Sequence, residues 1–286
     1  MKQCCLIIDG FALVYRAYYG LPNTIRNSSG LAVNAVIGFY NTLSSLISQI
    51  QPQYLAAVFD HPQPTFRHKL YPPYKANRPP MPVELQEQLP LIAELLAAME
   101  IPILKLPGYE ADDVIGTIAA NLPYGTEAYI ATVDRDTLQL VNDTVTVLIP
   151  NRRSNRIYTP DTVEAEIQLP PALIPDLKAL MGDASDNIPG ISMIGPKTAV
   201  KWLKRFGGLE QIIANAQLLR GKAGANLRAN KSQALLFKNL STIRINAPIA
   251  WCWKHCRLTP DLSPVLPTLA AFGIRAKLPQ TFTTTS

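Results

Sequence analysis

The chain has 286 residues, of which 48% are hydrophobic and 17% are charged, and its formal net charge is +6. This composition excludes an intrinsically disordered chain, and no apolar run is long enough to cross a membrane. Because the N-terminus also lacks a signal-peptide pattern, we expect a soluble, cytoplasmic protein of one or two domains.

The first half of the chain alternates short apolar runs with longer amphipathic segments, which is typical of a mostly parallel central sheet flanked by helices. The predicted strands are Cys4–Ile8, Leu55–Phe59, Pro102–Leu104, Tyr129–Val133 and Val145–Ile149. The predicted helices are Asn34–Gln49, Val83–Met99, Ala111–Ala120 and Pro160–Glu166. We therefore predict an α/β core over residues 1–170.

The segment from His61 to Pro82 interrupts this alternation. It contains seven prolines together with basic and aromatic side chains, and long connections without regular structure are often functional lids. If its middle is helical, Lys75 and Arg78 lie one turn apart with Tyr74 beside them. The two cations could then offset charge on a phosphate, and the aromatic ring could stack on an unpaired base. A solvated basic surface is the alternative.

After about Pro170 the pattern is helical, which predicts a second, smaller domain over residues 171–286. Within it, a glycine-bounded turn joins two helical stretches, and Gly195 with Pro196 begins the second. Backbone N–H groups at such a helix start can hold a phosphate without reading sequence. The polar side chains nearest to this turn are Lys197, Thr198 and Lys201. The alternative is a tight connection between two helices.

Nine of the 21 carboxylates lie at the ends of apolar segments, where a solubilising charge is not expected. They are Asp9, Asp60, Glu110, Asp112, Asp113, Asp134, Asp136, Asp183 and Asp186. Because the carboxyl ends of parallel strands meet at one edge of a sheet, we expect the acids that follow strands to converge there. Taken singly, each also fits an ordinary role, such as Asp9 in a turn or Asp136 as a helix N-cap.

Oxygen ligands without partnering His or Cys favour Mg²⁺ or Mn²⁺. Nine carboxylates exceed what one ion needs, which indicates two ions about 4 Å apart. Apart from these nine, 12 Asp and Glu remain against 27 Lys and Arg. An acidic centre within a basic surface suits a polyanion such as nucleic acid. A basic protein without such a partner is the alternative.

Six short motifs occur in the order of the 5′-nuclease family. The chain thus resembles the N-terminal 5′→3′ exonuclease domain of bacterial DNA polymerase I and its flap-endonuclease relatives. The motifs are Ile8-Asp9-Gly10, Val58-Phe59-Asp60, Phe66-Arg67-His68 with Tyr74-Lys75-Ala76-Asn77-Arg78, Gly108–Asp113, Asp134 with Asp136, and Gly182-Asp183 with Ser185–Gly190. The resemblance implies a resolvase/PIN-like nuclease core with a basic arch at 61–82. It also implies a helical domain with a helix–hairpin–helix at about 182–205 and a C-terminal tail.

The resemblance also implies roles for individual residues. One Mg²⁺ would be held by Asp9, Asp60, Glu110 and Asp112, and a second by Asp134, Asp136, Asp183 and Asp186, with Asp113 in support. Lys75 and Arg78 would form the catalytic pair of cations. DNA would be bound by Arg67, Tyr74, Gly190, Gly195, Lys197, Thr198 and Lys201. A K⁺ ion would lie at the helix–hairpin–helix, where Met193 replaces the glycine usual in the family and alters the backbone.

The function implied is a structure-dependent 5′→3′ exonuclease or flap endonuclease that hydrolyses DNA by a two-metal mechanism in primer removal and repair. Its substrates would be DNA with 5′ flaps, nicks or 5′ ends, including an RNA primer on DNA. We expect a stand-alone monomer that works with a separate DNA polymerase. One alternative is a non-catalytic relative that binds DNA structures. Another is a phosphatase or an RNA-directed nuclease, for which a helix–hairpin–helix would be unnecessary.

Overall fold

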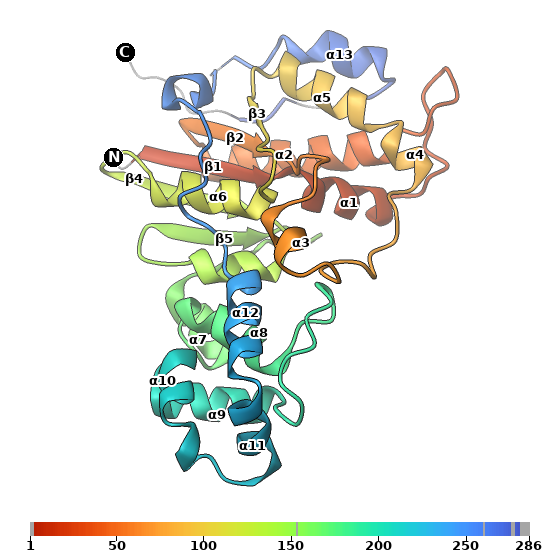
Figure 1. Cartoon of the computed structure of the whole chain (residues 1–286). Helices are drawn as coiled ribbons and strands as arrows, with labels where there is room; N and C mark the ends of the chain where they lie inside the picture. Colours follow the sequence, from red (N-terminus) through yellow and green to blue (C-terminus); the bar gives the residue numbers. More distant parts are fainter. Residues whose placement is uncertain (1–2, 153, 260, 276–277, 281–286) are drawn as a thin grey trace.

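The computed structural model describes residues 3–152, 154–259, 261–275 and 278–280. Its centre is a six-stranded sheet in the order β3-β2-β1-β4-β5-β6 (Figure 1). The strands are β1 (Gln3–Asp9), β2 (Tyr54–Val58), β3 (Ile103–Leu104), β4 (Thr126–Ala131), β5 (Val145–Ile149) and β6 (Arg156–Tyr158). Neighbouring strands are parallel except for the antiparallel pair β5 and β6. The predicted α/β class with a mostly parallel sheet is confirmed.

All five predicted strands are present, with ends that differ by at most three residues. The largest shift is in β4, which begins at Thr126 and ends at Ala131. The edge strand β6 was not predicted, because its three residues carry only one buried side chain, that of Tyr158. A strand this short has almost no periodicity to recognise.

The order of the strands reverses at β1, which lies between β2 and β4. In the register of the sheet Asp9 is opposite Val58, and Ile8 is opposite Ala131. The carboxyl ends of β1, β2 and β4 therefore lie side by side. Open α/β sheets bind their ligands at such a reversal, just beyond the strand ends.

Helices cover both faces of the sheet because successive strand residues point to opposite sides. Leu6 and Ile8 pack into one hydrophobic core, whereas Cys5 and Ile7 pack into another on the opposite face. The first core is covered by α1 (Gly10–Gly20), α2 (Asn34–Ile50), α5 (Leu89–Ala98) and α13 (Val265–Ala271), and the second by α6 (Ala111–Ala120). The sheet is thus the middle layer of three.

The predicted helix Val83–Met99 is in fact two, α4 (Val83–Gln86) and α5. Pro90 lies at the start of α5, where its missing N–H is tolerated, and this marks a new helix. The helix α1 was missed. We expected a turn after Asp9, but Gly10 begins α1 directly, and a Cβ on Gly10 would lie 2.3 Å from the Phe59 ring.

The proline-rich arch, residues 61–82, was expected to lack regular structure, but it contains the short helix α3 (Phe66–Leu70). A capping box begins this helix, because the side chains of Thr65 and His68 each pair with the other residue's backbone N–H. Beyond α3 the chain forms turns, and Arg78 N–H donates to the Lys75 carbonyl at 3.0 Å. Lys75 itself adopts a positive φ of 55°.

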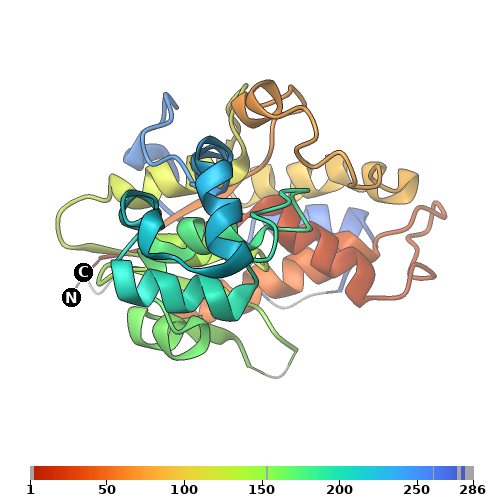
Figure 2. The same ribbon diagram turned by 60° about the horizontal axis from the view of Figure 1, so that its bottom comes forward.

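The second part of the chain is helical and extends from the sheet (Figures 1 and 2). Its helices are α8 (Ile174–Met181), α9 (Pro196–Phe206), α10 (Leu209–Ala214), α11 (Gly221–Ala229) and α12 (Lys231–Ser241). The preceding helix α7 (Pro160–Ile167) follows β6, and its Val163 packs in the core of the sheet. Among the described residues the 3-10 helices are η1 (Arg135–Leu140), η2 (Pro171–Leu173), η3 (Ala216–Leu218) and η4 (Trp253–Cys256). A separate hydrophobic core, with Leu180, Leu203 and Phe237, holds α8, α9 and α12 together.

The predicted helical domain, 171–286, is too long at its C-terminal end. After α12 the chain returns to the sheet, where α13 lies beside α5 (Figure 1). Leu262 and Leu269 belong to the core of the sheet, and Arg257 forms a bridge with Tyr54. Apolar side chains in this segment pack against α5 and β2, which local patterning does not reveal. No helix among the described residues is long and apolar enough to span a membrane.

Candidate active site

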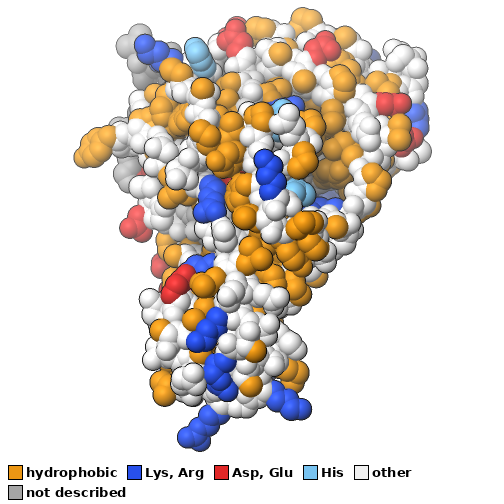
Figure 3. All heavy atoms as spheres, viewed as in Figure 1, with side chains coloured by type: hydrophobic (Ala, Val, Ile, Leu, Met, Phe, Trp, Pro, Cys, Tyr) orange, Lys and Arg blue, Asp and Glu red, His pale blue; other side chains and the backbone are white. Residues whose placement is uncertain are grey.

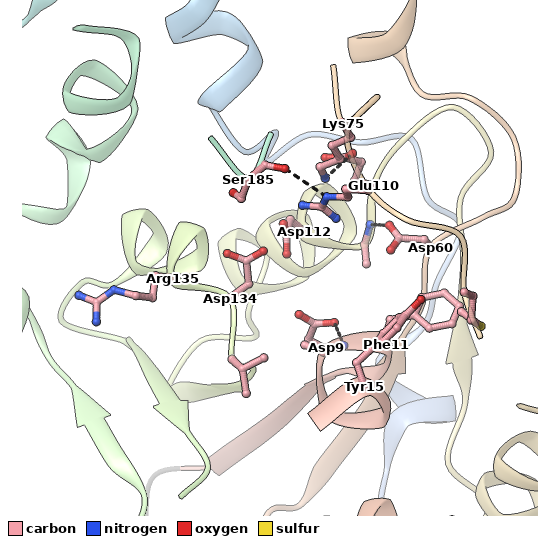
Figure 4. A pocket seen from close by; sticks show the side chains of 15 residues that line it. Asp9, Phe11, Tyr15, Asp60, Lys75, Glu110, Asp112, Asp134, Arg135 and Ser185 are labelled. Carbon is pink, nitrogen blue, oxygen red and sulfur yellow. Dashed lines mark hydrogen bonds and ion pairs between the residues drawn. The ribbon is translucent and has the colours of Figure 1, made fainter. Parts of the chain in front are cut away.

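A cavity of about 530 Å³ lies at the carboxyl ends of β1, β2 and β4 (Figure 4). Five of the predicted ligands line it, namely Asp9, Asp60, Glu110, Asp112 and Asp134. Lys75 and Arg78 of the arch line the same cavity, together with Phe11 and Tyr15 of α1. Arg135 also borders it, but its side chain points away from the carboxylates. The expected convergence of strand-end acids is therefore present.

Asp9 is held in place by neutral partners. Its carboxylate accepts hydrogen bonds from the Thr132 hydroxyl at 2.6 Å and from the Ala12 N–H at 3.1 Å, as the N-cap of α1. The side chain is 6% exposed. Burial raises the pKa of Asp9 to about 7, although these hydrogen bonds lower it. An acid that is costly to ionise without a cation is typical of a metal ligand site.

Asp112 shares this situation. Burial, followed by the charges of Asp134 and Asp9, raises the pKa of Asp112 well above its usual range. Asp134 caps η1 by accepting from the Asp136 N–H at 2.9 Å. Thus Asp134, and not Asp136, is the N-cap at this position. Because Asp134 lines the cavity with Asp9 and Asp112, the structure groups it with the first predicted ligand set.

Glu110 and Lys75 are paired at the base of the arch. The Lys75 ammonium contacts Glu110 Oε1 at 2.7 Å, and the Tyr74 hydroxyl donates to Oε2 at 3.0 Å. Glu110 lies at the N-cap of α6, while Asp60, an exposed residue, accepts from the Ala111 N–H at 2.8 Å. The start of α6 is therefore joined both to β2 and to the arch.

Three further acids form a cluster beside the cavity. One carboxylate oxygen from each of Asp136, Asp183 and Asp186 lies within 4.8 Å of the others, a spacing suited to a metal ion. Lys178 of α8 contacts Asp136 and also Asp183, the latter at 2.5 Å. Arg78 contacts Asp186 at 2.8 Å. Each member of this acidic trio is thus paired with a basic side chain.

Asp113 lies apart from the other acids. Its side chain is fully buried and faces Arg67 rather than the cavity. It also accepts from the backbone N–H groups of Glu110 and Arg244. Asp113 therefore stabilises the start of α6 without facing the cavity.

The structure corrects two of the expected DNA contacts. Arg67 is only 2% exposed, and its guanidinium binds Asp113 and the carbonyls of Leu240 and Thr242. Tyr74 is also 2% exposed, and its ring packs in the helical core. Neither side chain is accessible to a base or phosphate, because the arch folds back onto α6 and α12.

The remaining predicted DNA contacts lie at the hairpin. Gly195 is the N-cap of α9, as expected, and Lys197 and Lys201 are exposed on that helix with Thr198 half-buried. Gly190 has a φ of 68°, and a Cβ there would lie 2.3 Å from the Gly182 backbone nitrogen. Its lack of a side chain is therefore required by packing. Figure 3 shows Lys and Arg side chains projecting from the helical part.

Sequence reasoning missed Thr132 and Lys178. Thr132 donates to Asp9 and also accepts from the Asp134 N–H at 2.9 Å, so it links two strand ends. It was the only threonine or serine in the predicted strand Tyr129–Val133, which was an available signal. Lys178 precedes Asp183 by five residues, and nothing in the local pattern distinguishes it from a solvated lysine.

The fold and the cavity define a class of protein in which a resolvase-like α/β domain carries a carboxylate-rich crevice. Two family models match the chain, the N-terminal resolvase-like domain of 5′-3′ exonucleases over residues 4–168 and their C-terminal SAM fold over residues 169–262. The chain therefore belongs to the 5′-3′ exonuclease family.

Individual relatives agree with this assignment. The chain is 43% identical over 253 residues to DNA polymerase I of Bacillus caldotenax, a match that covers 87% of this chain and 29% of the polymerase. The chain thus spans less than a third of that relative's length. It is homologous to the exonuclease part of the polymerase.

Two solved structures share the whole fold. The bacteriophage T5 5′-exonuclease with bound zinc matches with a TM-score of 0.69 and 22% identity, over 94% of this chain and 97% of the other. A variant of the bacteriophage T5 flap endonuclease, in a pseudo-enzyme-product complex with DNA and metal ions, matches with a TM-score of 0.68 and 26% identity. That match covers 85% of this chain and 89% of the other.

Proposed function

We propose that this protein is a metal-dependent, structure-specific 5′→3′ exonuclease and flap endonuclease that hydrolyses phosphodiester bonds in DNA. The observation that carries the proposal is the convergence of five carboxylates in one cavity beneath the two cations of the arch. The relatedness to DNA polymerase I adds support and suggests a role in primer removal and repair. The T5 complex supports DNA as the substrate class.

The donor set fits divalent metal ions. Asp9, Asp112 and Asp134 crowd together, and among the described residues no Lys or Arg forms an ion pair with them. Oxygen-only ligands suit Mg²⁺, with Mn²⁺ as its close substitute. We assign Asp9, Asp60, Glu110, Asp112 and Asp134 to a first ion, and the acidic trio to a second. When bound, such ions neutralise phosphate charge and lower the pKa of water.

Lys75 and Arg78 supply positive charge over the same cavity. In the structure they are paired with Glu110 and Asp186. When those carboxylates are engaged as ligands, the two cations can turn toward a scissile phosphate. Fixed positive charge aimed at a phosphoryl oxygen stabilises the charge that builds up during displacement. The pair therefore acts on the substrate and not on the fold.

The hairpin would hold the duplex part of the substrate. The N-terminus of α9 presents free backbone N–H groups, and Lys197, Thr198 and Lys201 lie beside them. Such contacts grip the phosphate backbone in a sequence-independent manner. We further propose a K⁺ ion at the carbonyls of the hairpin, near Gly190 and Gly195.

The wider setting follows from the proposed activity. We propose a cytoplasmic monomer that acts on DNA with 5′ flaps, nicks or 5′ ends, including a 5′ RNA primer on DNA. A DNA polymerase would supply the displaced strand that this site removes.

A cleavage assay with purified protein and Mg²⁺ tests the proposal. A 5′-labelled flap should be cut, whereas Asp134→Ala should lower the rate by a factor of about 10³ or more while DNA binding persists. Asp143→Ala, which removes an exposed acid far from the cavity, is the matched control and should cleave normally. A well-folded wild-type protein that binds the flap without cutting it would instead be a DNA-structure binder.

A further inference from the structure

The carboxylates that line the cavity and those of the acidic trio differ in how their negative charge is balanced. Within the described residues, Asp9, Asp112 and Asp134 have no basic partner, and the hydrogen bonds found to Asp9 and Asp134 come from hydroxyl or backbone groups. The acidic trio is different. Lys178 contacts two of its members, Asp136 and Asp183, and Arg78 contacts the third.

Lys178 lies where a cation would be placed. It projects from α8, and its side chain is only 13% exposed. The trio's carboxylate oxygens lie within 4.8 Å of one another, and the ammonium touches two of these three acids.

An ammonium and a divalent ion cannot share these carboxylates. Both would bind the carboxylates of Asp136 and Asp183, and their like charges repel strongly at short range. Any ion that enters must first displace the ammonium, which removes two charge-assisted hydrogen bonds. In the cavity around Asp9 the Lys75 ammonium contacts Glu110 alone, and among the described residues no basic side chain forms an ion pair with Asp9, Asp112 or Asp134.

We propose that the Lys178 ammonium occupies the second metal position. The protein then binds one divalent ion tightly and a second ion only when the ammonium moves out. Arg78 does not play the same part, because Asp186 is the only member of the trio that it contacts and its side chain is half-exposed. The second ion would then be retained best when a substrate phosphate helps to hold it. This inference rests on the proposed two-metal site.

Titration of the metal-free protein with Mn²⁺, followed by electron paramagnetic resonance and without DNA, tests this directly. Wild type should show one tight site and a second at least about tenfold weaker, since each broken charge-assisted contact is worth roughly one factor of ten. In Lys178→Met the second site should tighten at least about tenfold, with the first unchanged, for the same reason. Lys178→Gln should behave like Lys178→Met.

Lys238→Met is the matched control. Lys238 also bridges two acids, Asp176 at 2.9 Å and Glu210 at 2.7 Å, in the same helical part of the chain. Its removal should leave both Mn²⁺ affinities as in wild type. Circular dichroism of each variant establishes that it is folded before titration.

Two equally tight Mn²⁺ sites in wild type would overturn the inference, and so would an unchanged second site in a folded Lys178→Met or Lys178→Gln protein. The readout involves neither DNA nor turnover. If the metal profile shifts as expected while flaps remain uncut, the proposed nuclease function fails and the role of Lys178 stands. If flaps are cut but the metal profile does not shift, the proposed role of Lys178 fails and the nuclease function stands.

Discussion

The Arg67 guanidinium forms two hydrogen bonds to the Asp113 carboxylate, at 2.6 Å and 2.8 Å, with both side chains buried. This pair joins α3 of the arch to α6, and further bonds of Arg67 reach the carbonyls of Leu240 and Thr242 at the end of α12. It therefore fixes the base of the arch against both parts of the chain.

Loss of Arg67 should destabilise the protein strongly. Arg67→Met leaves Asp113 buried and unpaired, and we expect the free energy of unfolding to fall by about 3–5 kcal/mol in urea denaturation. The double variant Arg67→Met/Asp113→Asn should recover part of this loss, because no lone charge stays buried and the amide oxygen can still accept from a backbone N–H group. Arg26→Met breaks an exposed pair with Glu84 and should cost at most about 1 kcal/mol. Equal effects of the two single variants would contradict a structural role for Arg67.

The stability of the metal-free protein should decrease as pH rises from about 4 to about 7. Burial raises the pKa of Asp9 from 3.8 to about 7 and that of Asp136 to about 6. Between the ordinary and the raised value, the folded protein holds protons that the unfolded chain has released. In this range each such group lowers the free energy of unfolding by about 1.4 kcal/mol per pH unit.

Thermal melts in EDTA at pH 5 and pH 8 measure this effect. The Tm should be lower at pH 8, and Mg²⁺ should restore more of it there than at pH 5. Asp9→Asn, which cannot ionise, should flatten the profile. A Tm that stays constant or rises between these pH values in EDTA would show that burial does not raise the pKa values of these acids.

Met193 should be a source of local strain. It adopts a φ of 69° and its side chain is 67% exposed. Packing of the side chain therefore does not offset the free-energy cost of this backbone conformation. We expect Met193→Gly to raise the free energy of unfolding by roughly 1 kcal/mol. Met193→Ala retains a Cβ and should bring no such gain, which separates backbone strain from loss of the side chain. A destabilised Met193→Gly protein would refute the argument.

Lys201 should contribute to DNA affinity through phosphate alone. In Lys201→Ala the affinity for duplex DNA should fall at every sequence, and the slope of log affinity against log salt should become shallower by about 1. Lys254→Ala, in η4 beside the sheet, is the control and should change neither. Fluorescence anisotropy across a salt series measures both quantities. A loss restricted to particular sequences would indicate base readout instead.

Much of the site could be predicted because the information is local. Apolar runs that end in Asp9, in Asp60 and near Asp134 reveal both the strands and the acids at their tips, and parallel strands bring those tips together. The start of α9 at Gly195 and Pro196 could be predicted in the same way. These features depend on periodicity and on residues adjacent in sequence.

The partners of these residues could not be predicted, because contacts across long stretches of sequence decide them. The sequence by itself determined that acids follow the strands and at which edge of the sheet these acids gather, since strand direction follows from the alternation of elements. Only the tertiary structure decided that Arg67 and Tyr74 are buried, that Asp134 joins Asp9, and that Lys178 neutralises Asp136 and Asp183. The physical reason is that burial and counter-charge depend on which helices pack together, and α3, α8 and α12 meet only in three dimensions.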